Sequence, residues 1–346
     1  CLLSRGLGDV YKRQGTNGKS SVADFFYQIL SLNKTPVASI GTLGIKKKGK
    51  FKKTKLTSLD IISLHEELTV LKKQKIDNVI IEASSHGLSQ GRLDGLNFKA
   101  GIFTNFSQDH LDYHKTMKNY FNSKSILFSS LLKKDKYMIT DSNINEFKKL
   151  KKIAKKRKLE IIKVNNSSIF ANQEEFSLLG DFQKTNLSMS ILAAGICGIN
   201  KEKIKSSIKK IKSVQGRLEQ IKTLPNKAKI IVDYAHTPEA LRTVLETLRN
   251  NFKENITLVF GCGGERDFKK RSLMAKIANK FCDKIYVTDD NPRFESPRKI
   301  RKEIIRYLKK QKYLEIGNRA TAIKFAIKNS KPFEIILIAG KGHETI

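Results

Sequence analysis

The sequence predicts an α/β protein with two domains, each built on a mostly parallel sheet. Short runs rich in Val and Ile alternate with segments of helical apolar spacing, which is typical of parallel strands joined by helices. A glycine-rich loop over residues 15–21 leads directly into one of those helical segments. The chain of 346 residues is long enough for two cores, and we place the boundary near residue 213.

The charge and the cysteine content of the chain exclude several classes of protein. Lys and Arg number 67 against 33 Asp and Glu, a formal net charge of +34. Because the lysines are spread along the whole chain, we interpret them mainly as a compositional bias on solvated faces, and secondarily as an attraction for an anionic substrate. No recognisable nucleic-acid-binding module accompanies them, so we expect no nucleic-acid partner. The cysteines lack paired spacing and indicate neither a disulfide framework nor a zinc cluster. They are Cys1, Cys197, Cys262 and Cys282.

The sequence contains no apolar run long enough to span a bilayer and no visible secretory leader. It therefore predicts a cytoplasmic protein without a membrane partner.

Residues 1–14 do not have the composition that usually precedes a phosphate loop. Such a loop normally follows a buried strand of Val, Ile and Ala, but residues 8–14 read Gly-Asp-Val-Tyr-Lys-Arg-Gln, and the chain does not begin with Met. We therefore expect residues 1–14 to be a leader that is foreign or mis-assembled, and the native sequence to begin near Gly15. On that hypothesis a central strand of the first sheet is missing.

The first domain, residues 15–213, is predicted from β-branched runs and from helical periodicity. Its helices begin with the one that follows the glycine-rich loop, and a Lys-rich hairpin is expected over 46–55. Strands are expected at 36–41, 77–82, 100–105, 137–140 and 159–164. Further helices are expected at 60–74, 117–132, 144–158, 182–197 and 201–212.

The second domain, residues 214–346, repeats the alternation on a smaller scale and is predicted to be a doubly wound, Rossmann-like α/β unit. Strands are expected at 228–233, 256–261, 284–288 and 334–339. Helices are expected at 237–250, 267–281, 297–309 and 318–329.

The glycine-rich loop has the chemistry of a phosphate cradle. Glycines allow backbone N–H groups to face an anion, and the helix that follows adds partial positive charge. Lys19 would reach the terminal phosphates and the Ser20 hydroxyl would hold Mg²⁺. The strict pattern has another Gly five residues before Gly18, where this chain has Arg13. The alternative is a polar turn followed by a helix cap.

Two polar clusters follow predicted strand ends, where open α/β sheets place ligands. The first is Glu82-Ala-Ser-Ser-His-Gly-Leu88, and the second is Asp109-His-Leu-Asp-Tyr-His114. Glu82 and His110 could ligate a metal. His110 and His114 have a spacing that suits zinc if the stretch is helical, but one carboxylate and one imidazole with waters suit Mg²⁺ or Mn²⁺ better. The alternative is a pair of capping or surface histidines.

These motifs, in this order, resemble the Mur ligase family of ATP-dependent amide ligases, which add amino acids to the peptidoglycan precursor. The resemblance continues through the second domain and spans residues 15–344. Its further motifs are Gly216-Arg-Leu-Glu219, Val232-Asp-Tyr-Ala-His-Thr-Pro238, Gly261-Cys-Gly-Gly-Glu-Arg-Asp267, Asp290-Asn-Pro-Arg293 and Ala339-Gly-Lys-Gly-His-Glu344. The resemblance implies a P-loop ATPase-type central domain with a mostly parallel sheet, followed by the family's C-terminal domain.

Within the family, the Asp-Asn-Pro-Arg motif marks the enzymes that add meso-diaminopimelate to UDP-N-acetylmuramoyl-L-alanyl-D-glutamate. A guanidinium fork binds a carboxylate at two points, and lysine as a substrate has no distal carboxylate to offer. By resemblance the diaminopimelate pocket comprises Arg266, Asp290, Asn291, Pro292, Arg293, Gly340 and Glu344.

The resemblance implies a reaction through an acyl phosphate, with ATP and Mg²⁺. The catalytic residues would be Lys19, Lys124 and His236, with Lys124 at the position of a lysine carbamylated by CO₂. A carbamate is an anion that can hold Mg²⁺, whereas the alternative is one more surface lysine. ATP would be bound by Gly15, Thr16, Asn17, Gly18, Lys19, Ser20, Ser21, Asn105 and Asp233. The metal would be held by Ser20, Glu82, His110 and carbamylated Lys124.

The remaining implied contacts are those with the muramoyl-dipeptide, from Thr57, Ser58, Ser84, Gln90 and Arg92. The family often has Pro after its Thr-Thr pair, where this chain has Ser58-Leu59. The resemblance covers two of the family's three domains, so we expect this polypeptide to bind ATP poorly and the nucleotide sugar very weakly. An inactive fragment is an alternative that stays open. The partners are small molecules and the expected state is a monomer.

Three alternatives to a diaminopimelate-adding ligase stay open at this point. The first is the L-lysine-adding homologue and the second is a folylpolyglutamate synthase-like ligase. The third, suggested by the positive charge, is a nucleic-acid-binding ATPase.

Overall fold

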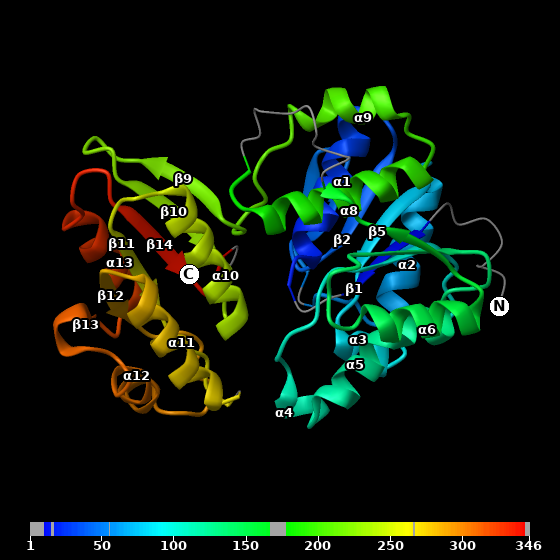
Figure 1. The fold of residues 1–346 in the computed structure, drawn as a ribbon. Helices are drawn as coiled ribbons and strands as arrows, with labels where there is room; N and C mark the ends of the chain where they lie inside the picture. Colours follow the sequence, from blue (N-terminus) through cyan, green and yellow to red (C-terminus); the bar gives the residue numbers. More distant parts are fainter. Residues whose placement is uncertain (1–9, 15–16, 55, 167–177, 266, 343–346) are drawn as a thin grey trace. The chain divides into compact units, whose positions relative to one another are not determined.

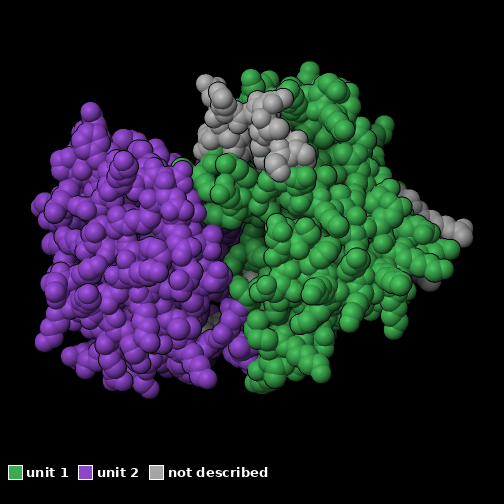
Figure 2. Space-filling model, in the orientation of Figure 1, with its two compact units in different colours: residues 1–107, 114–212 green, residues 108–113, 213–346 purple. Residues whose placement is uncertain are grey.

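The computed structural model describes residues 10–14, 17–54, 56–166, 178–265 and 267–342. The chain divides into two compact units, drawn in different colours in Figure 2. Unit 1 comprises residues 1–107 and 114–212, and unit 2 comprises residues 108–113 and 213–346. Each is an α/β unit with helices packed on a sheet (Figure 1).

The sheet of unit 1 has the strand order β4-β3-β2-β5-β1-β6-β7-β8. Pairing is parallel from β2 to β8, while β3 and β4 add an antiparallel hairpin at one edge. The strands are β1 (Val10–Gln14), β2 (Val37–Gly41), β3 (Gly44–Lys47), β4 (Lys50–Lys52), β5 (Asn78–Glu82), β6 (Phe98–Phe103), β7 (Tyr137–Thr140) and β8 (Glu160–Lys163). The carboxyl ends of β2, β5, β1 and β6 therefore meet at one edge of the sheet, where the loops that follow them carry the predicted site.

The prediction that this sheet lacks a central strand is wrong. Residues Val10–Gln14 form β1, which pairs in parallel with β5 on one side and with β6 on the other. The strand is held by backbone hydrogen bonds to both neighbours, and these do not require the Val and Ile composition on which the expectation rested. The phosphate loop thus follows a central strand, as the fold requires.

Helices cover both faces of the unit 1 sheet. The core on one face joins Val79 and Ile81 of β5 to Leu68 of α2 and Leu150 of α6. Since side chains alternate along a strand, Ile80 points to the other face, where α1 and α8 pack together and contact the sheet. The helices are α1 (Lys19–Leu32), α2 (Ile61–Lys73), α3 (Ser85–Ser89), α5 (Met117–Ile126), α6 (Phe147–Arg157), α8 (Asp181–Ile196) and α9 (Lys201–Ile208). The short helix α4 (Leu111–His114) begins in the segment 108–113, which belongs to unit 2. The predicted helix 117–132 is α5 continued by a π-helical turn, Leu127–Leu131.

The sheet of unit 2 has the order β13-β12-β11-β14-β10-β9 and is parallel except for β9. Its strands are β9 (Glu219–Thr223), β10 (Lys229–Asp233), β11 (Ile256–Phe260), β12 (Lys284–Val287), β13 (Tyr313–Glu315) and β14 (Ile335–Ala339). The sequence did not predict β9 and β13, because both are short edge strands whose residues are mostly exposed.

The helices of unit 2 pack on this sheet in two groups. Ala322 and Ala326 of α13 join Ile230, Val259 and Tyr286 in the core of one face. Helices α10, α11 and α12 contact one another in sequence, and Figure 1 shows α10 and α11 running side by side. The helices are α10 (Pro238–Asn251), α11 (Lys269–Phe281), α12 (Pro297–Ile305) and α13 (Arg319–Lys328), with a 3-10 turn at Lys310–Lys312.

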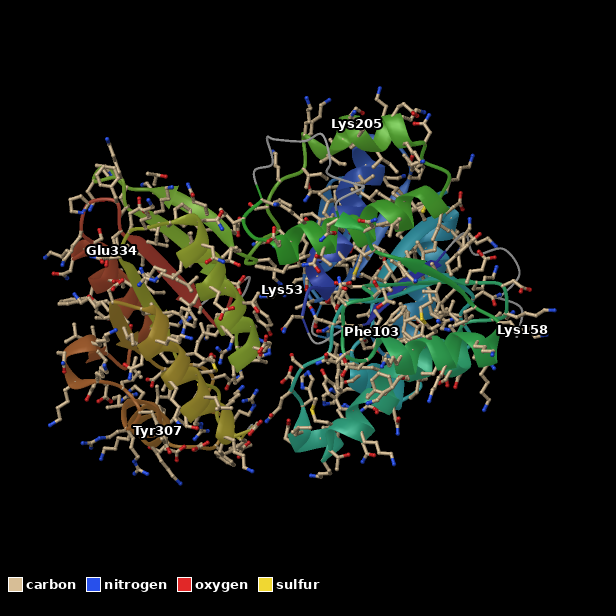
Figure 3. All side chains as sticks on the ribbon, viewed as in Figure 1. Lys53, Phe103, Lys158, Lys205, Tyr307 and Glu334 are labelled. Carbon is tan, nitrogen blue, oxygen red and sulfur yellow. The ribbon has the colours of Figure 1, made fainter. Side chains whose placement is uncertain are left out.

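Lysine side chains are exposed on the surface, including the labelled Lys158 and Lys205 in Figure 3. In the part of the chain that the structure describes, no helix combines the length and the apolar character needed to cross a membrane.

Candidate functional site

The loop before α1 is fixed to the carboxyl end of β6. Asn17 donates its backbone N–H to Asn105 Oδ1 at 2.8 Å, and Asn105 Nδ2 donates back to the Asn17 carbonyl at 3.1 Å. Thr104 Oγ1 donates to the same carbonyl at 2.6 Å. The Asn105 amide thus binds the loop itself, whereas Gly15 and Thr16 lie outside the described residues.

Gly18 is required at the start of α1 for two reasons. Its φ is +81°, in the left-handed region that favours glycine, and a Cβ there would lie 2.4 Å from Asn186 Oδ1 of α8. No side chain among the described residues caps the helix at this position. α1 thus begins directly after the glycine-rich loop, with Lys19 and the buried Ser20 in its first turn. That an anion binds at this helix N-terminus stays a prediction.

Glu82 is the centre of a buried carboxylate and hydroxyl cluster. It ends β5, is 1% exposed, and accepts a hydrogen bond from Ser20 Oγ at 3.1 Å. Thr42, directly after β2, donates its N–H at 3.2 Å and its Oγ1 at 3.0 Å to the same carboxylate. A Cβ on Gly41 would lie 2.4 Å from Glu82, so the end of β2 approaches the carboxylate closely.

This cluster fits a hard divalent cation rather than zinc. Its donors are a carboxylate and hydroxyls, and Mg²⁺ typically takes one or two carboxylates together with phosphate oxygens and waters. Among the described residues, no three side chains of His, Cys, Asp or Glu gather closely enough to hold a metal by themselves.

The zinc geometry considered for His110 and His114 does not occur. His110 has a φ of +54° and precedes α4, so the two rings are not one helical turn apart. His114 is buried, with Nε2 2.9 Å from Ser85 Oγ and Nδ1 3.3 Å from Ser123 Oγ. His110 lies in the segment 108–113 of unit 2, so the structure does not relate it to Ser20 and Glu82.

Lys124 is buried rather than on the surface. It is 1% exposed, on α5, with Nζ 4.7 Å from the centroid of the Tyr120 ring. The alternative of an ordinary surface lysine is therefore wrong.

Four of the five residues expected to contact the muramoyl-dipeptide are linked by hydrogen bonds around the end of β5. Ser58 Oγ donates to the Glu82 carbonyl at 3.1 Å and lies 3.1 Å from Ser84 Oγ. Arg92 Nη1 donates to the Ser58 carbonyl at 2.9 Å, and Thr57 Oγ1 lies 3.1 Å from Thr42 Oγ1. The fifth residue, Gln90, ends α3.

In unit 2 the loops after β11 and β12 are joined to each other. Arg293 Nη1 donates to the Gly264 carbonyl at 2.5 Å, and the Gly264 N–H donates to the Asn291 carbonyl at 2.9 Å. Asn291 Oδ1 in turn accepts from the Arg293 N–H at 3.2 Å. A Cβ on Gly340 would lie 3.3 Å from Asp290 Oδ2, which puts the end of β14 beside this loop. Arg266 and Glu344 lie outside the described residues.

His236 belongs to an electrostatic cluster that includes a residue the predictions did not select, Asp109. The Asp109 carboxylate lies 3.3 Å from His110 Nε2 and 3.8 Å from His236 Nε2. Burial alone would raise the pKa of Asp109, but His110, His236 and Lys270 together lower it. The pKa of His236 is lowered, chiefly by burial and against the pull of Asp109. Because it follows a strand end by only a few residues, Asp109 could have been selected from the sequence.

Asp233 has a structural role in this structure. Its carboxylate accepts the N–H groups of Leu218 and Ala235, each at 2.7 Å, and so joins β10 to the segment before β9. Burial raises its pKa to about 6, against the charge of Arg217 and these two hydrogen bonds.

The raised pKa makes Asp233 a source of pH-dependent stability. The Asp233 carboxyl group keeps its proton up to about pH 6 in the folded state but only up to about pH 4 in the unfolded state. The free energy of unfolding therefore falls as the pH rises from about 4 to about 6. Denaturant titrations should show this loss in the wild type and not in Asp233→Asn. Asp283→Asn is the control, because the lowered pKa of Asp283 keeps it ionised throughout that range. Equal pH slopes in the wild type and Asp233→Asn would contradict the prediction.

Together these features define an α/β protein in which a glycine-rich loop leads into a helix beside a buried carboxylate on a mostly parallel sheet, followed by a second α/β unit. The chain belongs to the Mur ligase family. It matches the Mur ligase middle domain over residues 14–194 and the Mur ligase glutamate ligase domain over residues 216–342.

Relatives of known name are similar over most of the chain. The UDP-N-acetylmuramoyl-L-alanyl-D-glutamate–2,6-diaminopimelate ligase of Rickettsia bellii is 41% identical, over 95% of this chain and 74% of the relative. That of Rickettsia conorii is 40% identical, over 97% and 75%. A solved structure of a ligase with that name is similar with a TM-score of 0.66 and 31% identity, over 98% of this chain and 74% of the other. A Yersinia pestis folylpolyglutamate synthase/dihydrofolate synthase, solved with AMPPNP and Mn, has a TM-score of 0.76, with 99% and 88% of the chains covered. At 16% identity it shows the shared fold alone.

Proposed function

We propose that this chain is the ATP-dependent ligase that joins meso-diaminopimelate to the D-glutamyl γ-carboxylate of UDP-N-acetylmuramoyl-L-alanyl-D-glutamate. The observation that carries the proposal is Arg293, whose guanidinium is fixed to the Gly264 carbonyl in the loop after β12. Such a fixed guanidinium retains donors for a carboxylate at the far end of the incoming amino acid. The names of relatives at about 40% identity agree with this substrate.

The reaction we propose has two steps. The γ-carboxylate attacks the terminal phosphorus of ATP, which forms an acyl phosphate and releases ADP. The diaminopimelate amine then attacks the acyl carbon, phosphate leaves, and the amine loses a proton. Positioning and electrostatics dominate catalysis because the transferred group is strongly charged.

Most of the residues that would supply those electrostatics belong to unit 1, and His110 belongs to unit 2. The N–H groups at the start of α1 and the Lys19 ammonium would hold the ATP phosphates, with Ser20 and Glu82 oriented by their mutual hydrogen bond. Mg²⁺, when bound, would neutralise developing charge on the phosphates. We assign its ligands to Ser20 and Glu82, and in addition to His110 and a carbamate on Lys124. Thr57, Ser58, Ser84, Gln90 and Arg92 would bind the muramoyl-dipeptide.

We assign ATP binding and the muramoyl-dipeptide to the domain 15–213, and the amino acid to 214–346. We further propose that the protein acts as a cytoplasmic monomer on small molecules, without a nucleic-acid partner. Filter binding at about 150 mM salt should detect no RNA or DNA retention, because non-specific phosphate contacts weaken steeply with salt.

The substrate is tested by measuring phosphate release from ATP. With UDP-N-acetylmuramoyl-L-alanyl-D-glutamate present, we expect activity with meso-diaminopimelate and none with L-lysine. Arg293→Ala should lower kcat/KM for diaminopimelate by about 100-fold, as expected for loss of a charge-assisted pair. Arg298→Ala, an exposed arginine in the same unit, is the control and should change nothing. Equal activity with L-lysine would keep the ligase chemistry and remove the diaminopimelate assignment.

A further inference from the structure

A buried arginine lies directly behind the loop that carries Arg293. Arg271, on α11, has a side chain that is 2% exposed. It donates from Nη1 to Glu295 Oε1 at 2.7 Å and from Nη2 to Glu295 Oε2 at 2.6 Å, a two-point pair. Nη1 also donates to Glu303 Oε2 of α12 at 2.7 Å. One guanidinium thus joins α11, α12 and the loop between β12 and α12.

The same bridge reaches the other loop of the amino-acid site. Arg271 Nη2 lies 3.4 Å from the Gly263 carbonyl, and Glu295 Oε2 accepts the Glu265 N–H at 3.3 Å. These contacts flank Gly264, whose carbonyl accepts from Arg293 and whose backbone approaches Pro292 so closely that a Cβ would lie 1.9 Å from its carbonyl oxygen. Movement of Glu295, two residues after Arg293, would therefore move both the guanidinium and the carbonyl that holds it.

We propose that the Arg271–Glu295 pair is a positioning device that fixes the loops 263–265 and 291–295 so that Arg293 meets the distal carboxylate of the incoming amino acid. Arg271 does not itself contact the substrate. The inference rests on the proposed function for the identity of that substrate, but the fixing of the two loops is a property of unit 2 alone.

The physical reason is that a two-point pair restricts orientation as well as distance. Arg293 is exposed and has a φ of +51°, so its own backbone does not favour the observed conformation. A flexible guanidinium at such a position would lose binding free energy on being ordered by each substrate molecule. The buried pair fixes the loop before the substrate arrives, and the hydrogen bond from Arg271 lowers the pKa of Glu295, which keeps it ionised.

The test uses Glu295→Gln, which keeps the shape and one acceptor but removes the charge and the two-point pairing. We expect KM for meso-diaminopimelate to rise about 10-fold, with kcat and KM for ATP within about twofold of wild type. Arg271→Lys should act in the same direction, because an ammonium cannot reproduce the fork. Asp283→Asn is the matched control, since it breaks an Arg–carboxylate pair of 2.6 Å at the opposite, amino-terminal end of β12. It should leave all three parameters unchanged.

Hydrogen exchange gives a second measurement that does not require activity. The N–H groups of Gly264 and Glu295 are bonded to the carbonyls of Asn291 and Pro292, and in Glu295→Gln they should exchange at least about 10-fold faster. The Gly340 N–H, bonded to the Asp233 carbonyl, should exchange at its wild-type rate. Unchanged exchange at Gly264, or an unchanged KM for diaminopimelate in an active enzyme, overturns the positioning role. If exchange were faster in Glu295→Gln but the wild-type protein did not ligate diaminopimelate, the proposed function would be overturned. The fixing of the two loops by the Arg271–Glu295 pair would still be established.

Discussion

Replacing Glu82 with Gln is expected to lower ligation by about 1,000-fold while the protein stays folded. Gln has the same shape and can still accept from Ser20 or Thr42, so the hydrogen-bonded ends of β2 and β5 should persist. The amide carries no negative charge, however, and is a poor ligand for a divalent cation that bridges to phosphates. Phosphate release and thermal unfolding, measured on the same preparation, separate the two effects.

The matched control is Glu67→Gln in the same unit. Glu67 is also buried, at 8% exposed, but it lies on α2 and pairs with Lys47 of the hairpin β3–β4 at 2.8 Å. Replacing Glu67 with Gln should leave turnover unchanged and should lower the free energy of unfolding only slightly. If Glu82→Gln retained more than about a tenth of the wild-type rate, Glu82 would not be a metal ligand.

Replacing Lys124 with Met is expected to reduce turnover by a similar factor, about 1,000-fold. Met has a comparable length and suits the buried site, where Lys124 is 1% exposed, so packing against Tyr120 should be preserved. It cannot form a carbamate, and the negative charge proposed to help hold Mg²⁺ would be lost. Turnover with and without bicarbonate is the first measurement.

The carbamate itself can be observed directly. Wild-type protein in ¹³C-bicarbonate should give one carbamate carbon resonance that is absent from Lys124→Met. The control is Lys118→Met, an exposed lysine on the same helix, which should keep both the resonance and the rate. A fully active Lys124→Met, or a wild-type protein without the resonance, would remove the carbamate from the mechanism.

The sequence was most informative for elements that can be recognised from the apolar pattern of their own residues. Buried strands such as β5 and β11, and amphipathic helices such as α2 and α10, were predicted within a few residues. A buried strand is a continuous apolar run in the sequence, and a helix with one buried face has apolar residues every three or four positions. The sequence also predicted that the glycine-rich loop leads directly into the helix α1, since Gly18 and the apolar periodicity after it are both local.

Composition failed where structure depends on backbone pairing with distant segments. Val10–Gln14 has no apolar run, yet it occupies the centre of the sheet because β5 and β6 supply hydrogen bonds on both sides. The edge strand β9 was missed for a related reason, since it needs only one partner and buries little.

For the site, the sequence by itself determined the residue types that carry the chemistry: the loop with Lys19 and Ser20, the carboxylate of Glu82, and the guanidinium of Arg293. The tertiary structure decided how they are held. It brought Thr42 to Glu82, buried Lys124 against Tyr120, and placed Arg271 behind the Arg293 loop. The Thr42–Glu82 and Arg271–Glu295 contacts join separate elements of the fold, whereas Lys124 and Tyr120 lie one turn apart on α5. A pattern within one segment reports its own burial and periodicity, but the position of a side chain relative to another element is fixed only when the whole sheet has formed.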